Sequence, residues 1–275
     1  MAGYQGWLAG AVAVIMLALA GASAAEAACT ATKSSDAVWL WHYRAALAHP
    51  RAILRAAQKK HLRRIYLQIA RPLRAYDPFL AAAHRRGIEV YALDGEPGYA
   101  LNQEPLLRRI GRIRGHAFDG VQLDVEPYTL PGFRADPANY IRGYLHLLTL
   151  ARREVPHALP LSAVIPAWFA QLRWRDGSVS GAVLQRADEV VVMSYQGGLR
   201  AAQRAALPVL QEAARAHKPA YIGVKPRQAR IGWPAPETLS AGYVIERYRH
   251  LREWPQAALL RDPAAPRSCS SAPLG

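Results

Sequence analysis

The sequence predicts a protein of the α/β class, a single (β/α)8 TIM barrel whose final helix is short or missing. Short β-branched or aromatic runs alternate with longer segments of helical periodicity, and eight such runs can be counted. The chain of 275 residues, without its first 27, has the length of one such barrel. No Gly/Ser or Pro linker divides it. An open doubly wound sheet is the alternative, but the first strand lacks the Gly-rich phosphate loop common in that fold.

The expected strands are rich in Val, Ile, Tyr and Trp, which is typical of buried parallel strands. They span residues 37–43, 64–70, 88–94, 118–126, 160–166, 188–195, 219–225 and 257–262. Helices are expected between them because each intervening segment begins near Pro, Asp or Ser or ends near Gly, Pro or His. These segments are 50–61, 77–86, 104–114, 137–154, 181–186, 201–217 and 236–254. The barrel therefore occupies residues 30–268, and residues 269–275 form a C-terminal tail.

The N-terminus has the pattern of an export signal. An apolar run over residues 8–20 is followed by small residues, with A-x-A sites that end at Ala24 or Ala27. We expect a signal peptide over residues 1–27, a secreted or periplasmic protein, and no membrane attachment after cleavage. An uncleaved anchor is an alternative because no Lys or Arg precedes the apolar run. Lipidation of Cys29 is another, although Glu26 is unusual for a lipoprotein signal.

The two cysteines, Cys29 and Cys269, lie near opposite ends of the exported chain. Export places them in an oxidising compartment, so we expect a disulfide between them. Such a bridge needs the first and last elements to meet, and a closed barrel satisfies this requirement. No histidines accompany the cysteines in zinc-finger spacing, and no P-loop, H-E-x-x-H or EF-hand pattern occurs. No metal or other cofactor is therefore expected.

The formal net charge is +15, in a chain with 51% hydrophobic and 20% charged residues. This composition excludes a disordered chain, a collagen-like repeat and a disulfide-dense miniprotein. The charge could serve an anionic partner, or it could reflect a general excess of Arg, since only five of the 35 basic residues are Lys. The Arg-dense segments 59–64 and 108–114 lack interleaved aromatics, so nucleic acid is not the expected partner.

The fourth expected strand ends in three polar residues at alternate positions, Gln122, Asp124 and Glu126. Residues two apart in a strand face the same way, so all three are expected to point into the barrel mouth. Two such carboxylates repel each other and are partly desolvated, which raises the pKa of one of them and suits a general acid. A structural salt bridge with an arginine is the alternative.

Two segments resemble motifs of the chitinase-like, family 18 glycoside hydrolases. FDGVQLDVEPY (118–128) resembles D-G-x-D-x-D-x-E on their fourth strand, and VVMSYQ (191–196) resembles M-x-Y-D on their sixth. The resemblance implies that Glu126 is the general acid, that Asp124 orients a 2-acetamido group, and that Tyr195 hydrogen-bonds its carbonyl in a substrate-assisted reaction. Gln122 and Gln196 replace acids of the family pattern, which indicates a divergent member.

We therefore expect an exported glycosidase that acts on a polysaccharide or oligosaccharide, with amino-sugar glycans as candidates. A non-catalytic carbohydrate-binding barrel and a basic binder of anionic polymers are the alternatives, and the sequence leaves the oligomeric state open. The predicted substrate-binding residues gather at the carboxyl ends of the strands: Gln122, Trp41, Tyr43, Asp94, Glu96, Tyr128, Trp168, Met193, Gln196 and Lys225.

Each group of these residues also has a structural interpretation. The aromatic side chains Trp41, Tyr43 and Trp168 could stack on sugar rings or be buried. Asp94 and Glu96 could form a second carboxylate site, or Asp94 could serve an Asp-Gly turn. Lys225 could bind an acidic sugar or pair with Asp124 or Glu126.

Overall fold

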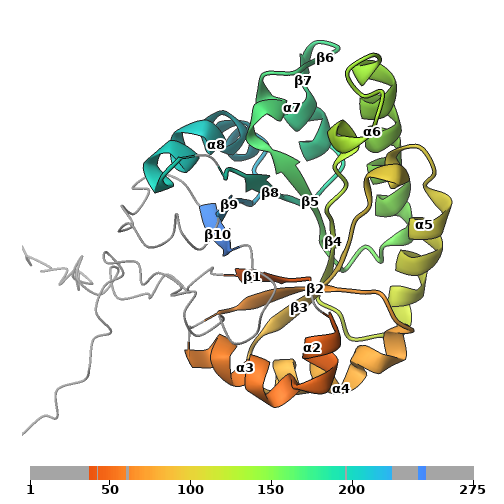
Figure 1. Cartoon of the computed structure of the whole chain (residues 1–275), viewed down its shortest axis with the longest axis vertical. Helices are drawn as coiled ribbons and strands as arrows, with labels where there is room; N and C mark the ends of the chain where they lie inside the picture. Colours follow the sequence, from red (N-terminus) through yellow and green to blue (C-terminus); the bar gives the residue numbers. More distant parts are fainter. Residues whose placement is uncertain (1–36, 42, 60–61, 196, 225–240, 246–275) are drawn as a thin grey trace, which may run out of the picture. The chain divides into compact units, whose positions relative to one another are not determined.

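Eight parallel strands close into a barrel in the computed structural model, which describes residues 37–41, 43–59, 62–195, 197–224 and 241–245 (Figure 1). Each strand pairs with the next along the chain, and the last pairs with the first. This arrangement confirms the predicted barrel. The strands are β1 (Ala37–Leu40), β2 (Arg64–Gln68), β3 (Glu89–Asp94), β4 (Gly120–Leu123), β5 (Leu161–Pro166), β8 (Glu189–Met193), β9 (Ala220–Val224) and β10 (Ala241–Ile245).

Helices α2 to α8 lie outside the strands in Figure 1, close to the predicted positions. Helix α6 begins where the sequence predicts, because the Asp136 carboxylate caps it by accepting from the Asn139 amide at 3.1 Å. Helix α2 was not expected, and the predicted helix at 104–114 is α5 followed by a 3-10 turn. The helices are α2 (Tyr43–Ala48), α3 (Pro50–Lys59), α4 (Asp77–His84), α5 (Glu104–Ile110), α6 (Pro137–Glu154), α7 (Val179–Leu184) and α8 (Leu199–Arg215).

Short 3-10 turns and one hairpin complete the described chain. The turns are η1 (Leu73–Tyr76), η2 (Pro97–Ala100), η3 (Gly111–Gly115), η4 (Pro127–Thr129) and η5 (Ala167–Ala170). Strands β6 (Arg173–Trp174) and β7 (Gly177–Ser178) form an antiparallel hairpin outside the barrel sheet. Three of the turns, η2, η4 and η5, follow β3, β4 and β5 directly and therefore lie at the carboxyl end of the barrel.

The eighth strand is not where the sequence placed it. The helix predicted over 236–254 is wrong at its centre, because Ala241–Ile245 forms β10 and pairs in parallel with both β9 and β1. Its sequence, AGYVI, suits a strand, and the two open neighbouring edges supply backbone partners on both sides. The strand predicted at 257–262 lies outside the described residues. So do the signal segment 1–27, Cys29, Cys269 and the tail 269–275.

The strands predicted to reach residues 126 and 195 end earlier. Strand β4 stops at Leu123 and β8 stops at Met193. The three residues with proposed catalytic roles, Asp124, Glu126 and Tyr195, therefore follow the strands rather than belonging to them.

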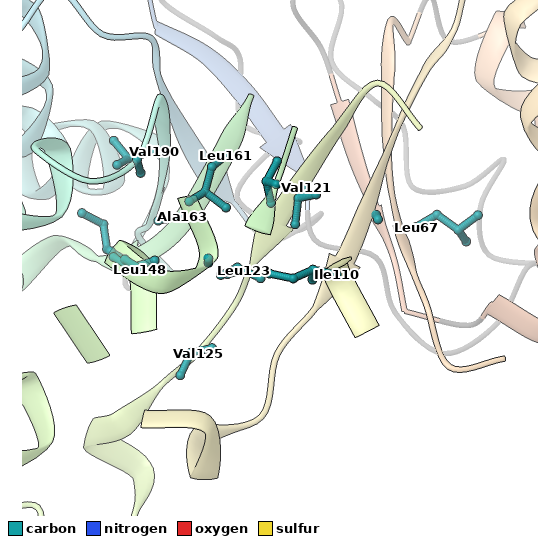
Figure 2. Packing of buried hydrophobic residues seen from close by; sticks show 14 of the residues in the cluster. Leu67, Ile110, Val121, Leu123, Val125, Leu148, Leu161, Ala163 and Val190 are labelled. Carbon is teal, nitrogen blue, oxygen red and sulfur yellow. The ribbon is translucent and has the colours of Figure 1, made fainter. Parts of the chain in front are cut away.

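Alternate residues of each strand separate the core into two parts. Outward-facing residues pack against the helices, and Figure 2 shows Val121 and Leu123 of β4 beside Leu161 and Ala163 of β5 within this layer. Inward-facing residues fill the barrel as a second cluster: Ala37, Trp39, Tyr66, Tyr91, Leu93, Val164 and Val191. The interior is a packed core, so ligands have access only at its ends.

A buried ion pair closes the amino-terminal end of the interior. Arg64 Nη1 donates to both carboxylate oxygens of Glu189 at 2.8 and 2.9 Å, and the Tyr66 hydroxyl donates to the same carboxylate at 3.0 Å. The guanidinium carbon lies 4.1 Å from the Tyr91 ring centroid, a cation–π contact. The Glu189 side chain is 5% exposed, so it depends on Arg64 for its compensating charge.

Replacing Arg64 by Met should lower the free energy of unfolding by about 3–5 kcal/mol, because it leaves Glu189 buried without its cation. The matched control is Arg63→Met, since Arg63 is the exposed neighbour and should change stability by no more than about 0.5 kcal/mol. Urea denaturation of both variants measures the difference. Equal stabilities would contradict a structural role for the pair.

Candidate active site

Backbone hydrogen bonds fix the chain at Asp124 and Glu126, the two acidic residues that follow β4. The Asp124 amide donates to the Asp94 carbonyl at 3.0 Å, which extends the β3–β4 ladder one step beyond the strand. The Glu126 carbonyl accepts from both the amide and the hydroxyl of Thr129, at 3.0 and 2.8 Å. Both acidic side chains are half-buried. The chain thus fixes them at the carboxyl end of the fourth barrel strand, as predicted.

Tyr128 positions the Glu126 carboxyl group. Its hydroxyl donates to Glu126 Oε2 at 2.7 Å. Burial, followed by the nearby charge and hydrogen bond of Glu126, raises the pKa of Tyr128 well above its usual range. Tyr128 therefore stays protonated and continues to donate. This bond fixes the position of Oε2 within the Glu126 carboxyl group.

An aromatic cluster surrounds Tyr128. Its ring packs edge-on against Trp168 and Phe169 of η5, with centroids 5.3 and 6.1 Å away, and against Phe133 at 6.5 Å. Trp168 is 39% exposed, one of three large apolar side chains of the described residues with substantial exposure. The structure therefore leaves part of this predicted stacking residue accessible, directly beside the residue that holds Glu126.

Gln122 lies deeper, inside the barrel, and is fully buried. Its side-chain oxygen accepts from the Trp39 indole, and its amide donates to Ser162 Oγ at 3.0 Å. Gln122 is thus a hydrogen-bonded interior residue of β4, two positions before Asp124. The side chain at position 122 is therefore neutral, and Asp124 has no acidic residue two positions before it.

Tyr144 of α6 was not predicted as a site residue. It is completely buried, and its hydroxyl has no hydrogen-bond partner among the described residues. Burial and the charge of Asp124 raise the pKa of Tyr144. A buried aromatic on a helix is indistinguishable from core in the sequence, so only the fold shows that this hydroxyl is near the Asp124 charge.

The sixth barrel strand, β8, ends at Met193, and Ser194 and Tyr195 follow it. Met193 and Tyr195 are half-buried and pack against the interior cluster, as does Trp41 after β1. Between them, Ser194 Oγ donates to the Ala202 carbonyl at 2.8 Å, which ties the end of β8 to α8. The predicted substrate roles of Tyr195, Met193 and Trp41 stay predictions. Gln196 and Lys225 lie outside the described residues.

Tyr43 follows β1 in a basic environment. Its hydroxyl accepts from Arg44 Nε at 3.2 Å. The hydrogen bond from Arg44, with a further contribution from Arg71 after β2, lowers the pKa of Tyr43 despite opposing desolvation. Its predicted substrate contact stays a prediction, and its environment is cationic rather than purely aromatic.

Asp94 and Glu96 lie in different environments, since Asp94 is buried and Glu96 is exposed. Asp94 shares the strand face of Val90 and Ala92, which pack toward the helices, whereas Tyr91 and Leu93 face the interior. Its carboxylate accepts from the Gly95 amide at 2.8 Å and from Arg109 Nη1 of α5 at 2.5 Å. Glu96 is exposed. The Asp-Gly turn interpretation describes the contacts of Asp94, and substrate contact by either residue stays a prediction.

No group of three or more His, Cys, Asp or Glu side chains within the described ranges could hold a metal ion. Over the same ranges, no helix combines the length and apolar character that crossing a membrane requires.

Comparison with known proteins identifies the fold. No family model matches the chain, and no curated protein is similar to it in sequence. Among solved structures, an endo-β-N-acetylglucosaminidase from Cordyceps militaris has a TM-score of 0.53 at 13% identity, covering 78% of this chain and 81% of its own. The chain has a TIM-barrel fold. The predicted resemblance to chitinase-like barrels is confirmed at the level of the fold.

Two further solved structures have similar TM-scores, and they belong to enzymes of different chemistry. A deoxyribose-phosphate aldolase from Toxoplasma gondii ME49 has the same TM-score, 0.53, at 12% identity, covering 82% of this chain and 92% of its own. A Cordyceps militaris endo-β-N-acetylglucosaminidase with an aspartate and the glutamate two residues later replaced by their amides, in complex with fucosyl-N-acetylglucosamine-Asn, gives 0.50 at 12% identity and covers 78% and 81%. Enzymes of different chemistry share the barrel, so function must be argued from the site.

Burial raises the pKa of the Asp94 carboxyl, although Arg109 and the Gly95 amide oppose the shift. Folded Asp94 therefore keeps its proton at pH values where the unfolded chain has lost it. The free energy of unfolding should fall as pH rises from the ordinary Asp value, about 3.9, through the raised one. Urea midpoints over this pH range should show the decline in the wild type and a smaller decline in Asp94→Asn.

The control for this experiment is Asp176→Asn. Asp176 is exposed at the β6–β7 turn, and the variant leaves Asp94 in place, so it should keep the wild-type slope. Identical slopes in all three proteins would contradict the raised pKa of Asp94.

Proposed function

We propose that this chain is a glycoside hydrolase that cleaves an amino-sugar-containing polysaccharide or oligosaccharide, with Glu126 as the general acid. The observation that carries the proposal is the Glu126 carboxyl group, held by Tyr128 at 2.7 Å at the carboxyl end of the fourth barrel strand. Active sites of (β/α)8 barrels lie at this end. A half-buried carboxyl group with one fixed oxygen is suited to donate a proton from the other.

The spacing of the two acids supports the same proposal. In the solved endo-β-N-acetylglucosaminidase variant, the replaced acids are an aspartate and the glutamate two residues later, the spacing of Asp124 and Glu126. The bound compound in that structure contains N-acetylglucosamine. An amino-sugar glycan is therefore the substrate class that we propose for this chain.

The reaction we propose is substrate-assisted. Glu126 gives its proton to the glycosidic oxygen as the bond from that oxygen to the anomeric carbon breaks. The carbonyl oxygen of the 2-acetamido group bonds to the anomeric carbon, and the Asp124 carboxylate stabilises the resulting positive charge. Water then attacks the anomeric carbon and breaks its bond to the acetamido oxygen, so that the ring formed by the acetamido group opens. The attacking water loses a proton to Glu126, which restores the acid. Tyr195 holds the acetamido carbonyl.

Export is part of the proposal. It rests on the apolar segment 8–20 and the small residues that follow it. The proposal includes a disulfide between Cys29 and Cys269, because export would place both cysteines in an oxidising compartment.

Glu126→Gln should lower turnover of amino-sugar polymers by about 10²–10⁴-fold, because it removes the proton donor and keeps the shape. Reducing-end release from a panel of such polymers, with the full chain, measures the effect. Glu104→Gln is the matched control, since Glu104 is an exposed acid of α5 with a 70% exposed side chain. Equal turnover by Glu126→Gln and the wild type would sink the assignment.

A non-catalytic carbohydrate-binding barrel is the second candidate, favoured by the neutral Gln122 in the interior beneath Asp124. It predicts saturable glycan binding without product in both the wild type and Glu126→Gln. Product formation that disappears in Glu126→Gln would exclude it.

Trp168→Ala should weaken glycan binding by about tenfold, equivalent to 1.4 kcal/mol, because a flat exposed ring beside Tyr128 is lost. We expect the effect in KM or Kd more than in kcat. Leu207→Ala is the control, as Leu207 of α8 has nearly the same exposure, 38% against 39%. Unchanged binding by Trp168→Ala would remove this residue from the proposed site.

A further inference from the structure

A backbone hydrogen bond to Asp94, at the end of the neighbouring strand β3, holds the backbone of Asp124. Asp94 is the last residue of β3 and is registered opposite Leu123, the last residue of β4. Beyond that pair, the Asp124 amide donates to the Asp94 carbonyl at 3.0 Å. The position of Asp94 therefore sets where the chain runs as it leaves β4, immediately before the two acids of the proposed site.

Gly95 makes a second, closer contact with the same segment. A Cβ added to Gly95 would lie 2.0 Å from the Asp124 carbonyl oxygen and 2.5 Å from its carbonyl carbon. These are backbone atoms that cannot move aside as a flexible side chain would. Lack of space thus requires glycine, and the Gly95 backbone lies directly against the carbonyl of Asp124.

The Asp94 side chain holds this contact in place. One carboxylate oxygen accepts from the Gly95 amide at 2.8 Å, and the other accepts from Arg109 at 2.5 Å. The carboxylate is 7% exposed and the Arg109 side chain 38% exposed. A charge-assisted bond to a nearly buried carboxylate is stronger and more directional than a surface ion pair. Helix α5 is thereby tied to the Asp94–Gly95 peptide.

Helix α6 holds the far end of the segment that runs from Asp94 through η2 to Ala100. Turn η2 packs against α6, and a Cβ added to Gly143 of α6 would lie 2.1 Å from the Ala100 carbonyl oxygen. The segment from Asp94 to Ala100 is therefore fixed at both ends by backbone contacts too close for any side chain. It has little freedom to move without moving the Asp124 segment.

We propose that Asp94, Gly95 and Arg109 are positioning residues for Asp124 and Glu126. The Arg109–Asp94 pair fixes the Gly95 peptide, and that peptide fixes the direction in which the chain carries the two carboxyl groups away from β4. This inference rests on the proposed function of Glu126. It assigns to Asp94 a role different from the substrate contact that its sequence position suggested, since it acts through Asp124 from behind the sheet.

The chain offers matched controls for this proposal. Arg108 is adjacent to Arg109 on α5 but pairs with the exposed Glu104, and the two side chains are 61% and 70% exposed. Arg109→Met and Asp94→Asn should lower kcat by about 10–100-fold with little change in KM, as expected when acids are displaced by about 1 Å. Arg108→Met and Glu104→Gln should stay within about twofold. Arg109→Lys, which keeps the charge, should recover part of the loss.

Hydrogen exchange provides a readout that does not need activity. In Arg109→Met and Asp94→Asn, a peptide containing the Asp124 amide should exchange faster, while a peptide from β8 should exchange as in the wild type. Faster exchange in both peptides would mean general destabilisation and would overturn a local positioning role. Faster exchange at Asp124 with unchanged kcat would also overturn it.

The two proposals fail separately. If Glu126→Gln loses activity but Arg109→Met and Asp94→Asn keep wild-type kcat and exchange, the positioning role is wrong and the proposed function stands. If Glu126→Gln is as active as the wild type, the proposed function fails, and with it the positioning role in this reaction. Gly95→Ala is an additional variant, and Asp94→Asn retains the test if that protein does not fold.

Discussion

Closure of the eight-stranded sheet is the constraint on which the rest of the structure depends. Once β10 pairs with both β9 and β1, no strand edge is left open in the sheet, and each strand has one face inside and one against the helices. Polar groups on the inner face must then find partners inside. Gln122 bonds to Trp39 and Ser162, and Glu189 bonds to Arg64. Only the residues beyond the strand ends are available for chemistry.

Different contacts fix the two acidic residues that follow β4. Glu126 is held through its side chain by Tyr128, whereas Asp124 is held through its backbone by Asp94 and Gly95. Each arrangement fixes one end of the acidic segment. The aromatic cluster around Trp168 lies beside Glu126 and gives the site an apolar surface next to its charged one. An acid beside an exposed aromatic ring suits a sugar ring with polar edges and flat apolar faces.

Seven of the eight strands could be predicted from the sequence because each is a compact run of β-branched and aromatic residues, as in VVVM of β8. The eighth could not, because AGYVI lies between residues with helical periodicity, and its strand state comes from two partners far away in the sequence. The acids after β4 were predictable from their alternation and motif. Arg109 and Tyr144 were not, because an arginine on a basic helix and an aromatic on a buried helix look ordinary until the fold brings them to Asp94 and Asp124.

The central claim is that Glu126 and an acetamido group of the substrate together break a glycosidic bond. The most direct measurement is the anomeric form of the first product released by the full chain from β-linked N-acetylglucosamine oligosaccharides, followed by proton NMR before mutarotation. Attack by the acetamido group followed by water at the same carbon inverts it twice, so we expect the β anomer first. Release of the α anomer first, or no product from any amino-sugar oligosaccharide, would contradict the account.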